Sequence, residues 1–325
     1  MSAIAPASPE LALPTGIVFD GATRLPDWGL IRARGEDAAS FLQGQLTNDL
    51  ALLPEGRARL AGYCSAKGRL LASFVVWRAS PGEFLLACSA DVLPATLKRL
   101  SMFVLRARCK LSDASAELAL WGLSGAAAET QLGASAPAEA LGVAHQGEAQ
   151  VVRLPDALGQ PRFLWAAPAA QAPAGLAELA PAAWRWLEVH SGVVRIVAAT
   201  VEHFVPQMVN FELVGGVDFK KGCFPGQEVV ARSQYRGTLK RRAVLLAGAV
   251  PLAEGQEVFH DQDPGQPAGT VALAASLPAG DGDRHLALVE LKRAALGSGH
   301  LHLAAADGPL LSPRALPYPL PQDDA

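Results

Sequence analysis

The amino-acid sequence changes character near Gly237, and this change constrains the fold more than any other feature. After Gly237, strand-like runs at 243–246, 270–273, 286–291 and 300–303 alternate with Gly, Pro and Asp turns. Such runs, with little helix signal between them, predict a small antiparallel β-barrel. Before Gly237, helix-like and strand-like apolar patterns are mixed, which predicts α+β domains.

Three local signals refine this prediction. Residues 68–78 and 84–88 predict a β-hairpin, because a Ser-Pro-Gly turn separates two apolar runs. Pro181 stands where a helix would begin, and Trp184 is spaced to lie on its buried face. The alanine-rich residues 126–183 are weakly patterned and predict no definite element.

The composition excludes several classes of protein. The chain has 325 residues, half of them apolar and 18% charged, so it can bury the cores of two or three soluble domains. Its net charge of −3 gives no overall attraction to nucleic acid or anionic membranes. Because we find no membrane-length apolar run and no basic leader at the N-terminus, we expect a cytoplasmic protein without a membrane partner.

The four cysteines are scattered and form no Cys-x-x-Cys pair. This spacing does not resemble a disulfide framework, and it does not make a zinc or cluster site by itself. A reducing compartment is therefore expected. The cysteines are Cys64, Cys88, Cys109 and Cys223.

Positive charge is concentrated in residues 218–242. This segment contains seven basic residues and two acidic ones, although the whole chain has a net negative charge. This excess suits a site for an anionic tail or a phosphate backbone, but a solvated basic face explains it equally well. The basic residues are Lys220, Lys221, Arg232, Arg236, Lys240, Arg241 and Arg242.

Within this segment, Cys223 differs from the other cysteines. It follows Lys221 by two residues and precedes a short helix expected after Gly226, and both features favour the thiolate. Glu228 and Arg232 are spaced for an i,i+4 ion pair on that helix. A nucleophilic enzyme would also need a base, but the sequence gives no reason to place a histidine beside the thiol.

Residues 221–228, which read Lys-Gly-Cys-Phe-Pro-Gly-Gln-Glu, resemble the signature of the YgfZ family. The resemblance continues through residues 204–217 and 230–237. A weaker match, Leu-Thr-Asn-Asp at 46–49, resembles the first domain of this family and of the glycine-cleavage T-protein.

The resemblance implies a fold of the α+β class. It is the glycine-cleavage T-protein-like fold, with two related α+β domains and a C-terminal antiparallel β-barrel around a central channel that holds tetrahydrofolate. The corresponding segments are a disordered tail at 1–16, a first folate-binding domain at 17–115, a second domain with the signature at 116–236, the barrel at 237–318 and a loose tail at 319–325.

The resemblance also implies a role. Members of this family are folate-dependent accessory proteins that keep iron–sulfur enzymes active, including a tRNA methylthiolation enzyme. Iron–sulfur enzymes or assembly proteins are then the partners, and tetrahydrofolate or a one-carbon derivative is the cofactor. Cys223 would be the working thiol and could contact an iron–sulfur cluster transiently. The supporting motif residues are Lys221, Gly222, Phe224, Gly226, Gln227 and Glu228, and the expected folate contacts are Asn48, His190, Arg232 and Arg236.

Two departures separate this chain from the T-protein. Ala72 and Ser73 stand where the T-protein carries an Asp-Asp pair, so an aminomethyltransferase would lack its main catalytic carboxylate. His190 stands where the T-protein has a pterin-binding Glu, and an imidazole cannot make the two-point contact of a carboxylate. A one-carbon transferase and an RNA-binding module that uses the basic run at 232–242 remain the alternative functions. Direct nucleic-acid binding is not favoured, because Tyr235 is the one aromatic residue interleaved in that run.

Overall fold

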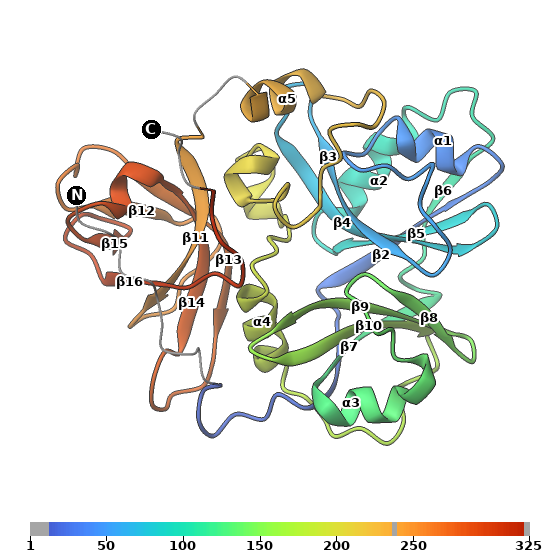
Figure 1. Ribbon diagram of the computed structural model, residues 1–325, viewed down its shortest axis with the longest axis horizontal. Helices are drawn as coiled ribbons and strands as arrows, with labels where there is room; N and C mark the ends of the chain where they lie inside the picture. Colours follow the sequence, from blue (N-terminus) through green and yellow to red (C-terminus); the bar gives the residue numbers. More distant parts are fainter. Residues whose placement is uncertain (1–12, 236–238, 322–325) are drawn as a thin grey trace.

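The computed structural model describes residues 13–235 and 239–321, and Figure 1 shows that they form three packed units. The predicted tails at 1–16 and 319–325 lie partly outside the described residues, and Arg236 lies wholly outside them. The first unit is a five-stranded sheet in the order β3-β4-β5-β2-β6. Its helices are α1 (Ala38–Gln43) and α2 (Leu93–Ser101). Its strands are β2 (Trp28–Arg34), β3 (Ala58–Cys64), β4 (Leu70–Ser80), β5 (Glu83–Ser89) and β6 (Lys110–Asp113).

The hairpin predicted from the sequence is β4 and β5, which pair antiparallel across the Ser-Pro-Gly turn. Both strands are apolar along nearly their whole length, because one face packs on helices and the other faces the second unit. The prediction is confirmed because the signal is local: two apolar runs and a turn.

The second unit is a five-stranded sheet in the order β1-β7-β10-β9-β8. Its first strand corrects the predicted domain boundary. β1 (Gly21–Arg24) falls within the segment expected to be the first domain, yet it pairs antiparallel with β7 (Leu118–Ser124) of the second sheet. The chain therefore starts in the second sheet and crosses to the first, and a four-residue strand carries no local signal of its partner.

The alanine-rich residues are also more regular than the sequence indicated. They form α3 (Gly125–Leu132), β8 (Val143–Gln146), β9 (Ala149–Ala157) and β10 (Gln160–Pro168). Alanine favours helices, yet three of these four segments are strands, so the packing of each segment decides its structure.

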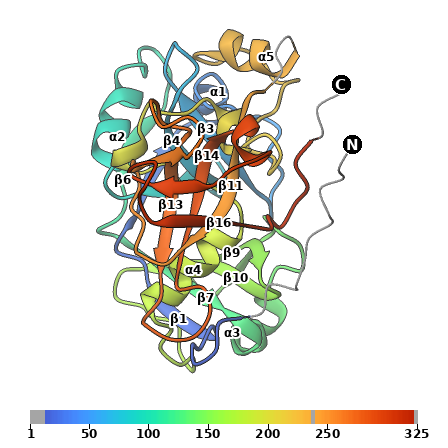
Figure 2. The same cartoon turned by 90° about the vertical axis from the view of Figure 1, so that its left-hand side faces the viewer.

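The third unit is a closed antiparallel barrel in the order β11-β14-β13-β12-β15-β16, which faces the viewer in Figure 2. Three of the four strand-like runs predicted from the sequence lie within barrel strands, and the fourth overlaps β15 except for its first residue. The short β12 and β16 lacked a clear pattern. The strands are β11 (Arg241–Gly248), β12 (Glu257–His260), β13 (Gly269–Ser276), β14 (His285–Lys292), β15 (Leu301–Leu303) and β16 (Leu310–Arg314).

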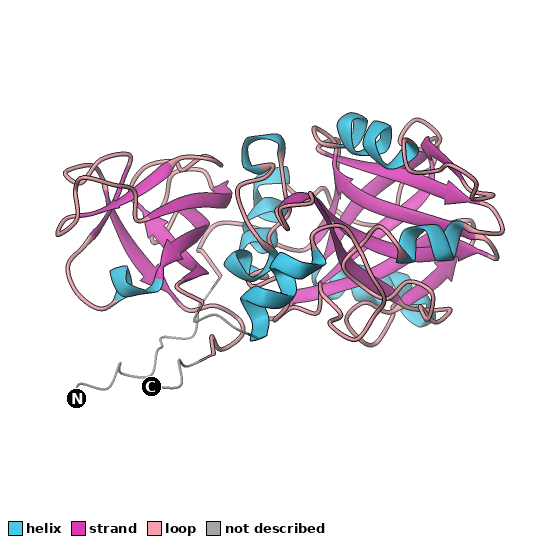
Figure 3. Ribbon diagram, turned by 90° about the horizontal axis from the view of Figure 1, so that it is seen from above, coloured by secondary structure: helices cyan, strands magenta, loops and turns pink. Residues whose placement is uncertain are grey.

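Helix α4 (Pro181–His190) joins the three units. It begins at Pro181 as predicted, and it buries Trp184, Trp186 and Leu187. Figure 3 shows helices lying between the barrel and the two sheets. One apolar cluster includes residues of both sheets, α4 and the barrel, so the units share a core. Helix α5 (Gln227–Tyr235) lies at the top of Figure 1. Within the described residues, no helix combines the length and the apolar character needed to cross a lipid bilayer.

A chain of ion pairs runs through the junction of the three units. Arg195 pairs with Glu188 of α4 at 2.7 Å and with Asp27, in the crossing between the sheets, at 2.7 Å. Arg185 of α4 pairs with Glu188 at 2.6 Å and with Glu254 of the barrel at 2.6 Å. The five charges therefore link both sheets, the central helix and the barrel.

The two central charges of this network are buried, so each depends on its partners, whereas Asp27 is largely exposed. Glu188 and Arg195 each expose 5% of the side chain. Burial alone would raise the pKa of Glu188, but Arg195 and Arg185 outweigh it and lower that pKa to about 2. Burial likewise opposes the charge on Arg195, but Glu188 and Asp27 raise its pKa above the ordinary value. The guanidinium also lies 4.7 Å from the ring centroid of Trp28.

We predict that Glu188 makes folding stability depend on acid pH. Its pKa is lower in the folded chain than in an unfolded one, so its stabilisation is complete above about pH 4.5 and is lost as the pH falls toward 2. Glu188→Gln should lower the free energy of unfolding at pH 7 by about 3 kcal/mol, because the buried guanidinium of Arg195 and the half-buried one of Arg185 lose their carboxylate.

Urea unfolding at a series of pH values measures this effect. The difference between wild type and Glu188→Gln should shrink as the pH falls below about 4.5. The control is Glu36→Gln, whose pair with Arg108 is exposed on both sides and contributes little. Equal effects of the two substitutions at pH 7 would contradict the role given to the buried network.

Candidate functional site

The candidate site is the loop at residues 221–228, which carries the predicted thiol. Cys223 is exposed, whereas Cys64 and Cys88 are buried and Cys109 is half-buried. Burial raises the pKa of Cys64 and of Cys88 to about 12, and it raises the pKa of Cys109 as well. All four cysteines lie in the described part of the chain, and Cys223 is therefore the one available for surface chemistry.

Lys221 braces this loop against the first unit. Its ammonium donates to the carbonyl oxygens of Gln43, at the end of α1, and of Leu46, the latter at 2.5 Å. It also lies 5.1 Å from the ring centroid of Phe224. Burial lowers the pKa of Lys221 to about 8, with opposing effects from Asp49 and other nearby charges. The structure shows Lys221 mainly as an anchor at the C-terminal end of a helix.

The two sequence motifs are bonded directly to each other just before this loop. The Thr47 hydroxyl donates to the Gly216 carbonyl at 2.6 Å, and the Asn48 amide donates to the Gly215 carbonyl at 2.6 Å. In return, the Asp218 backbone N–H donates to the Thr47 carbonyl at 3.0 Å. The Leu-Thr-Asn-Asp motif therefore holds the start of the thiol loop.

The far end of the loop packs so closely on the β3–β4 turn that it requires glycine. Gly226 has φ +78°, and a Cβ there would lie 2.3 Å from the Ser65 carbonyl oxygen and 2.6 Å from Gly68 Cα. Gly68 also has a positive φ, and a Cβ there would lie 2.8 Å from the Cβ of Val229. A Cβ at Gly222 would meet nothing within 4 Å, so Gly222 leaves the surface beside the thiol open.

The remaining motif residues shape the turn into α5. The side-chain oxygen of Gln227 accepts a hydrogen bond from the Phe224 backbone N–H at 3.2 Å. Glu228 and Arg232 form the predicted i,i+4 ion pair at 2.8 Å, with both side chains largely exposed. The thiol thus lies on a bend held at both ends and followed by a helix.

The basic segment does not form one positive surface. Arg242 is buried against Glu212 and the Gln207 carbonyl, and Arg241 pairs with Glu290. Both arginines belong to the barrel strand β11. Their carboxylate partners, Glu212 and Glu290, neutralise their charges. Lys220 and Lys240 are exposed, and Arg236 lies outside the described residues. This arrangement weakens the RNA-binding alternative, which needed the whole run.

The structure places two of the expected folate contacts apart. The side chain of Asn48 donates to Leu60 O as well as to Gly215 O, and its oxygen accepts from Asp49 N and Arg59. It lines a surface groove of about 600 Å³ between the first sheet and residues 215–220. His190 is not among the residues that line this groove.

His190 lies at the end of α4, against the barrel. Its ring packs on Trp186 with centroids 5.3 Å apart. Burial lowers its pKa to about 4, although Asp283 of the barrel acts in the opposite direction. His190 is therefore neutral at physiological pH.

A small cavity of about 40 Å³ lies between the two sheets. Ser73, expected from the sequence at the position of a T-protein aspartate, lines it beside Glu188. The Ser73 hydroxyl accepts from Ile196 N at 2.9 Å, and the Glu188 carboxylate is held by two arginines. Arg162 also lines this cavity, and its Nε has no hydrogen-bond partner. The space suits a few waters and is too small for a pterin.

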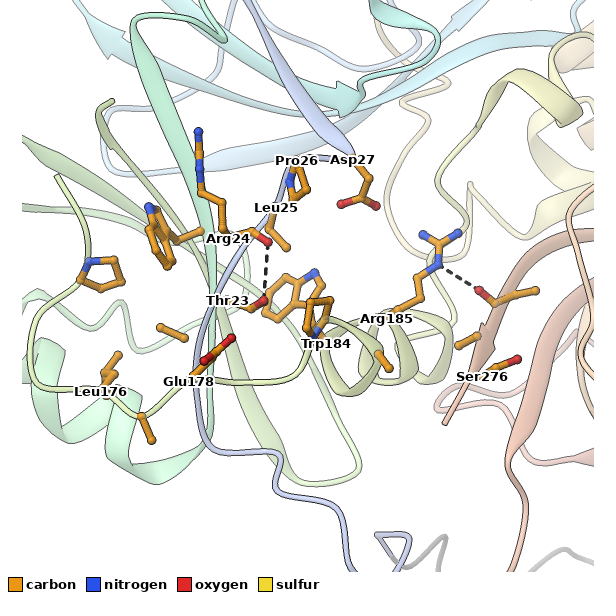
Figure 4. Close-up of a pocket in the computed structure, with 18 of the residues that line it drawn as sticks. Thr23, Arg24, Leu25, Pro26, Asp27, Leu176, Glu178, Trp184, Arg185 and Ser276 are labelled. Carbon is orange, nitrogen blue, oxygen red and sulfur yellow. Dashed lines mark hydrogen bonds between the residues drawn. The ribbon is translucent and has the colours of Figure 1, made fainter. Parts of the chain in front are cut away.

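A much larger groove, of about 1030 Å³, opens where β1, α4 and the barrel meet. Figure 4 shows Asp27 and Arg185 near each other in it, with Glu178 and Trp184 among its lining side chains. Arg185 donates to the Ala274 carbonyl at 2.9 Å. Cys223 lines neither this groove nor the small cavity. The sequence did not indicate the groove, because its residues come from five separate segments of the chain.

Comparisons with known proteins show the family of this chain. The family model described as "GCVT N-terminal domain" matches residues 25–153. Curated relatives called "tRNA-modifying protein YgfZ" include one from Sodalis glossinidius, 31% identical over 98% of this chain and 99% of the relative. The chain belongs to the YgfZ family. Another relative of that name, from Edwardsiella ictaluri, is 36% identical over 86% of this chain and 88% of its own.

A solved structure confirms the fold of this YgfZ-family chain. The glycine cleavage system aminomethyltransferase T from Bartonella henselae aligns with a TM-score of 0.73 over 92% of this chain and 86% of the other, at 20% identity. The predicted T-protein-like α+β fold with a C-terminal barrel is therefore correct. Within the described residues, no group of three or more His, Cys, Asp or Glu side chains could hold a metal ion.

We predict that Lys221 stabilises the thiol loop through its bonds to α1. Lys221→Met keeps the aliphatic stem but removes both donors, so the free energy of unfolding should fall by about 1–3 kcal/mol. Lys220→Met is the control, because Lys220 is exposed and such changes usually cost less than about 0.5 kcal/mol. Thermal denaturation of both variants measures the difference. Similar melting temperatures would show that the hydrogen bonds of Lys221 do not stabilise the fold.

Proposed function

We propose that this chain is a tetrahydrofolate-binding accessory protein for the assembly or repair of iron–sulfur enzymes, including tRNA-modifying enzymes. The observation that carries the proposal is the exposed thiol of Cys223 on a bend fixed at both ends. The name of the curated relatives, tRNA-modifying protein YgfZ, supports the tRNA part of the role.

The geometry suits a thiol that acts on a partner. Cys223 is exposed, and the open Gly222 surface lets another protein approach the sulfur. Lys221 and Gly226 fix the backbone on either side, so little conformational entropy is lost when the sulfur makes a contact. No histidine hydrogen-bonds to Cys223 among the described contacts, which favours a contact or carrier role over that of a base-activated nucleophile.

Tetrahydrofolate fits the large groove better than the small cavity. A volume near 1030 Å³ is in the range of small-molecule sites, and 40 Å³ is not. The carboxylates of Glu178 and Asp27 can accept hydrogen bonds from the amino and N–H groups of a pterin, and Arg24 can pair with a glutamate carboxylate. When bound, the folate would supply or hold a one-carbon unit.

Aminomethyl transfer receives no support from the small cavity that Ser73 and Glu188 line. Ser73 provides a hydroxyl that is already bonded to Ile196 N, and the nearby Glu188 is tied to Arg185 and Arg195. Without a free carboxylate at this position, positive charge developing on a transferred methylene would not be stabilised.

We expect Cys223→Ser to abolish the cellular function without loss of fold. Complementation of a deletion strain, read as the activity of a tRNA-modifying iron–sulfur enzyme, measures the function. Thermal denaturation should show an unchanged melting temperature, because the side chain is exposed. The control is Cys109→Ser, which removes a half-buried thiol elsewhere. Full complementation by Cys223→Ser would refute the thiol role.

We expect Arg24→Ala and Glu178→Gln each to weaken tetrahydrofolate binding about tenfold, because each removes a charged partner worth about 1.5 kcal/mol. Isothermal titration of the full chain measures this. Arg232→Ala is the matched variant on α5, and it tests the expectation drawn from the sequence. If Arg232→Ala weakened binding and the groove variants did not, the folate tail would lie on α5 instead.

A further inference from the structure

The segment between α2 and β6 exposes an unusual run of large apolar side chains. Met102 is 58% exposed, Phe103 45% and Leu105 84%. These are three of the eight large hydrophobic residues that are exposed in the described chain, and they fall within four positions. Single exposed apolar residues are normal, whereas a contiguous group marks an interaction surface.

Positive charge surrounds this apolar run. Residues 92–112 contain five basic residues and no acidic one. Lys98, Arg99 and Arg106 are exposed. Arg108 pairs with Glu36 and Asp37 of the first unit, and the guanidinium of Arg99 interacts with the Tyr63 phenol. Exposed basic residues therefore lie on both sides of this apolar run, or apolar patch, in the chain, and Lys98 and Arg99 line the same groove as Met102.

A groove of about 390 Å³ adjoins the patch. Tyr63, Leu71 and Val201 provide much of its apolar lining, and Met102 stands at its border with the patch. Lys98 and Arg99 lie on its edge, and Asp91 is the acidic residue that lines it. Asp91 accepts a hydrogen bond from the Ala198 backbone N–H at 2.9 Å, so its charge is partly compensated. The groove has room for one or two apolar side chains of a partner.

We propose that residues 98–108 and this groove dock an acidic amphipathic segment of a partner protein. Apolar side chains of that segment would fill the groove and cover Met102, Phe103 and Leu105, and flanking carboxylates would pair with Lys98, Arg99 and Arg106. A concave groove beside the apolar run favours a protein segment over a lipid surface, because a membrane has no side chain to fill a groove. This proposal does not depend on the folate site or on the thiol of Cys223.

The test uses the full chain and a fluorescent synthetic helix of leucine and glutamate, with its leucine–lysine counterpart as the charge control. Fluorescence anisotropy should show binding of the acidic helix only, weaker at high salt. Leu105→Ser and Arg106→Glu should each weaken binding about tenfold. Leu310→Ser, at a half-exposed leucine of the barrel, and Lys240→Glu are the matched controls and should have no effect.

Three outcomes would overturn the proposal. The first is no binding of the acidic helix to the wild-type chain. The second is equal loss in Leu105→Ser and Leu310→Ser, which would mean that the peptide binds without using the patch. The third is sedimentation with phosphatidylglycerol vesicles that Leu105→Ser abolishes, without peptide binding, which would assign the patch to an anionic membrane surface.

Discussion

The arrangement of the three units depends on the buried ion pair between Glu188 and Arg195. Glu188 lies on α4, and Arg195 reaches the crossing between the sheets through Asp27. Arg185 extends the network to the barrel. Buried charges of this kind are costly to separate, so they favour one relative placement of the units even where the surrounding packing is apolar. The groove and the small cavity lie on either side of this network.

The thiol loop depends on a second set of contacts, mostly hydrogen bonds to backbone carbonyls. Lys221, Thr47 and Asn48 tie residues 215–221 to the first unit. Gly226 then approaches the β3–β4 turn too closely for any side chain. Two motifs that lie about half the chain apart are thus one structural device, which presents Cys223 to solvent without burying it.

The large groove, the thiol loop and the apolar patch belong to different elements of the structure. The large groove lies between the second sheet, α4 and the barrel, the thiol loop precedes α5, and the apolar patch follows α2. Cys223 does not line the groove. A folate in the groove would therefore influence the thiol through the packed units rather than by direct contact. The separate surfaces suit an accessory protein that meets a partner while it holds a small molecule.

The sequence alone determined the features that arise from neighbouring residues. The hairpin of β4 and β5, the start of α4 at Pro181, four of the six barrel strands and the Glu228–Arg232 pair each follow from short-range patterns. The special position of Cys223 was also visible, because its neighbours in the chain differ from those of the other cysteines. Only the tertiary structure decided that β1 joins the second sheet, that Arg242 is buried against Glu212 and that Lys221 caps α1. Each of these depends on a partner far away in the chain, and local sequence carries no record of which distant group will satisfy a strand edge or a buried charge.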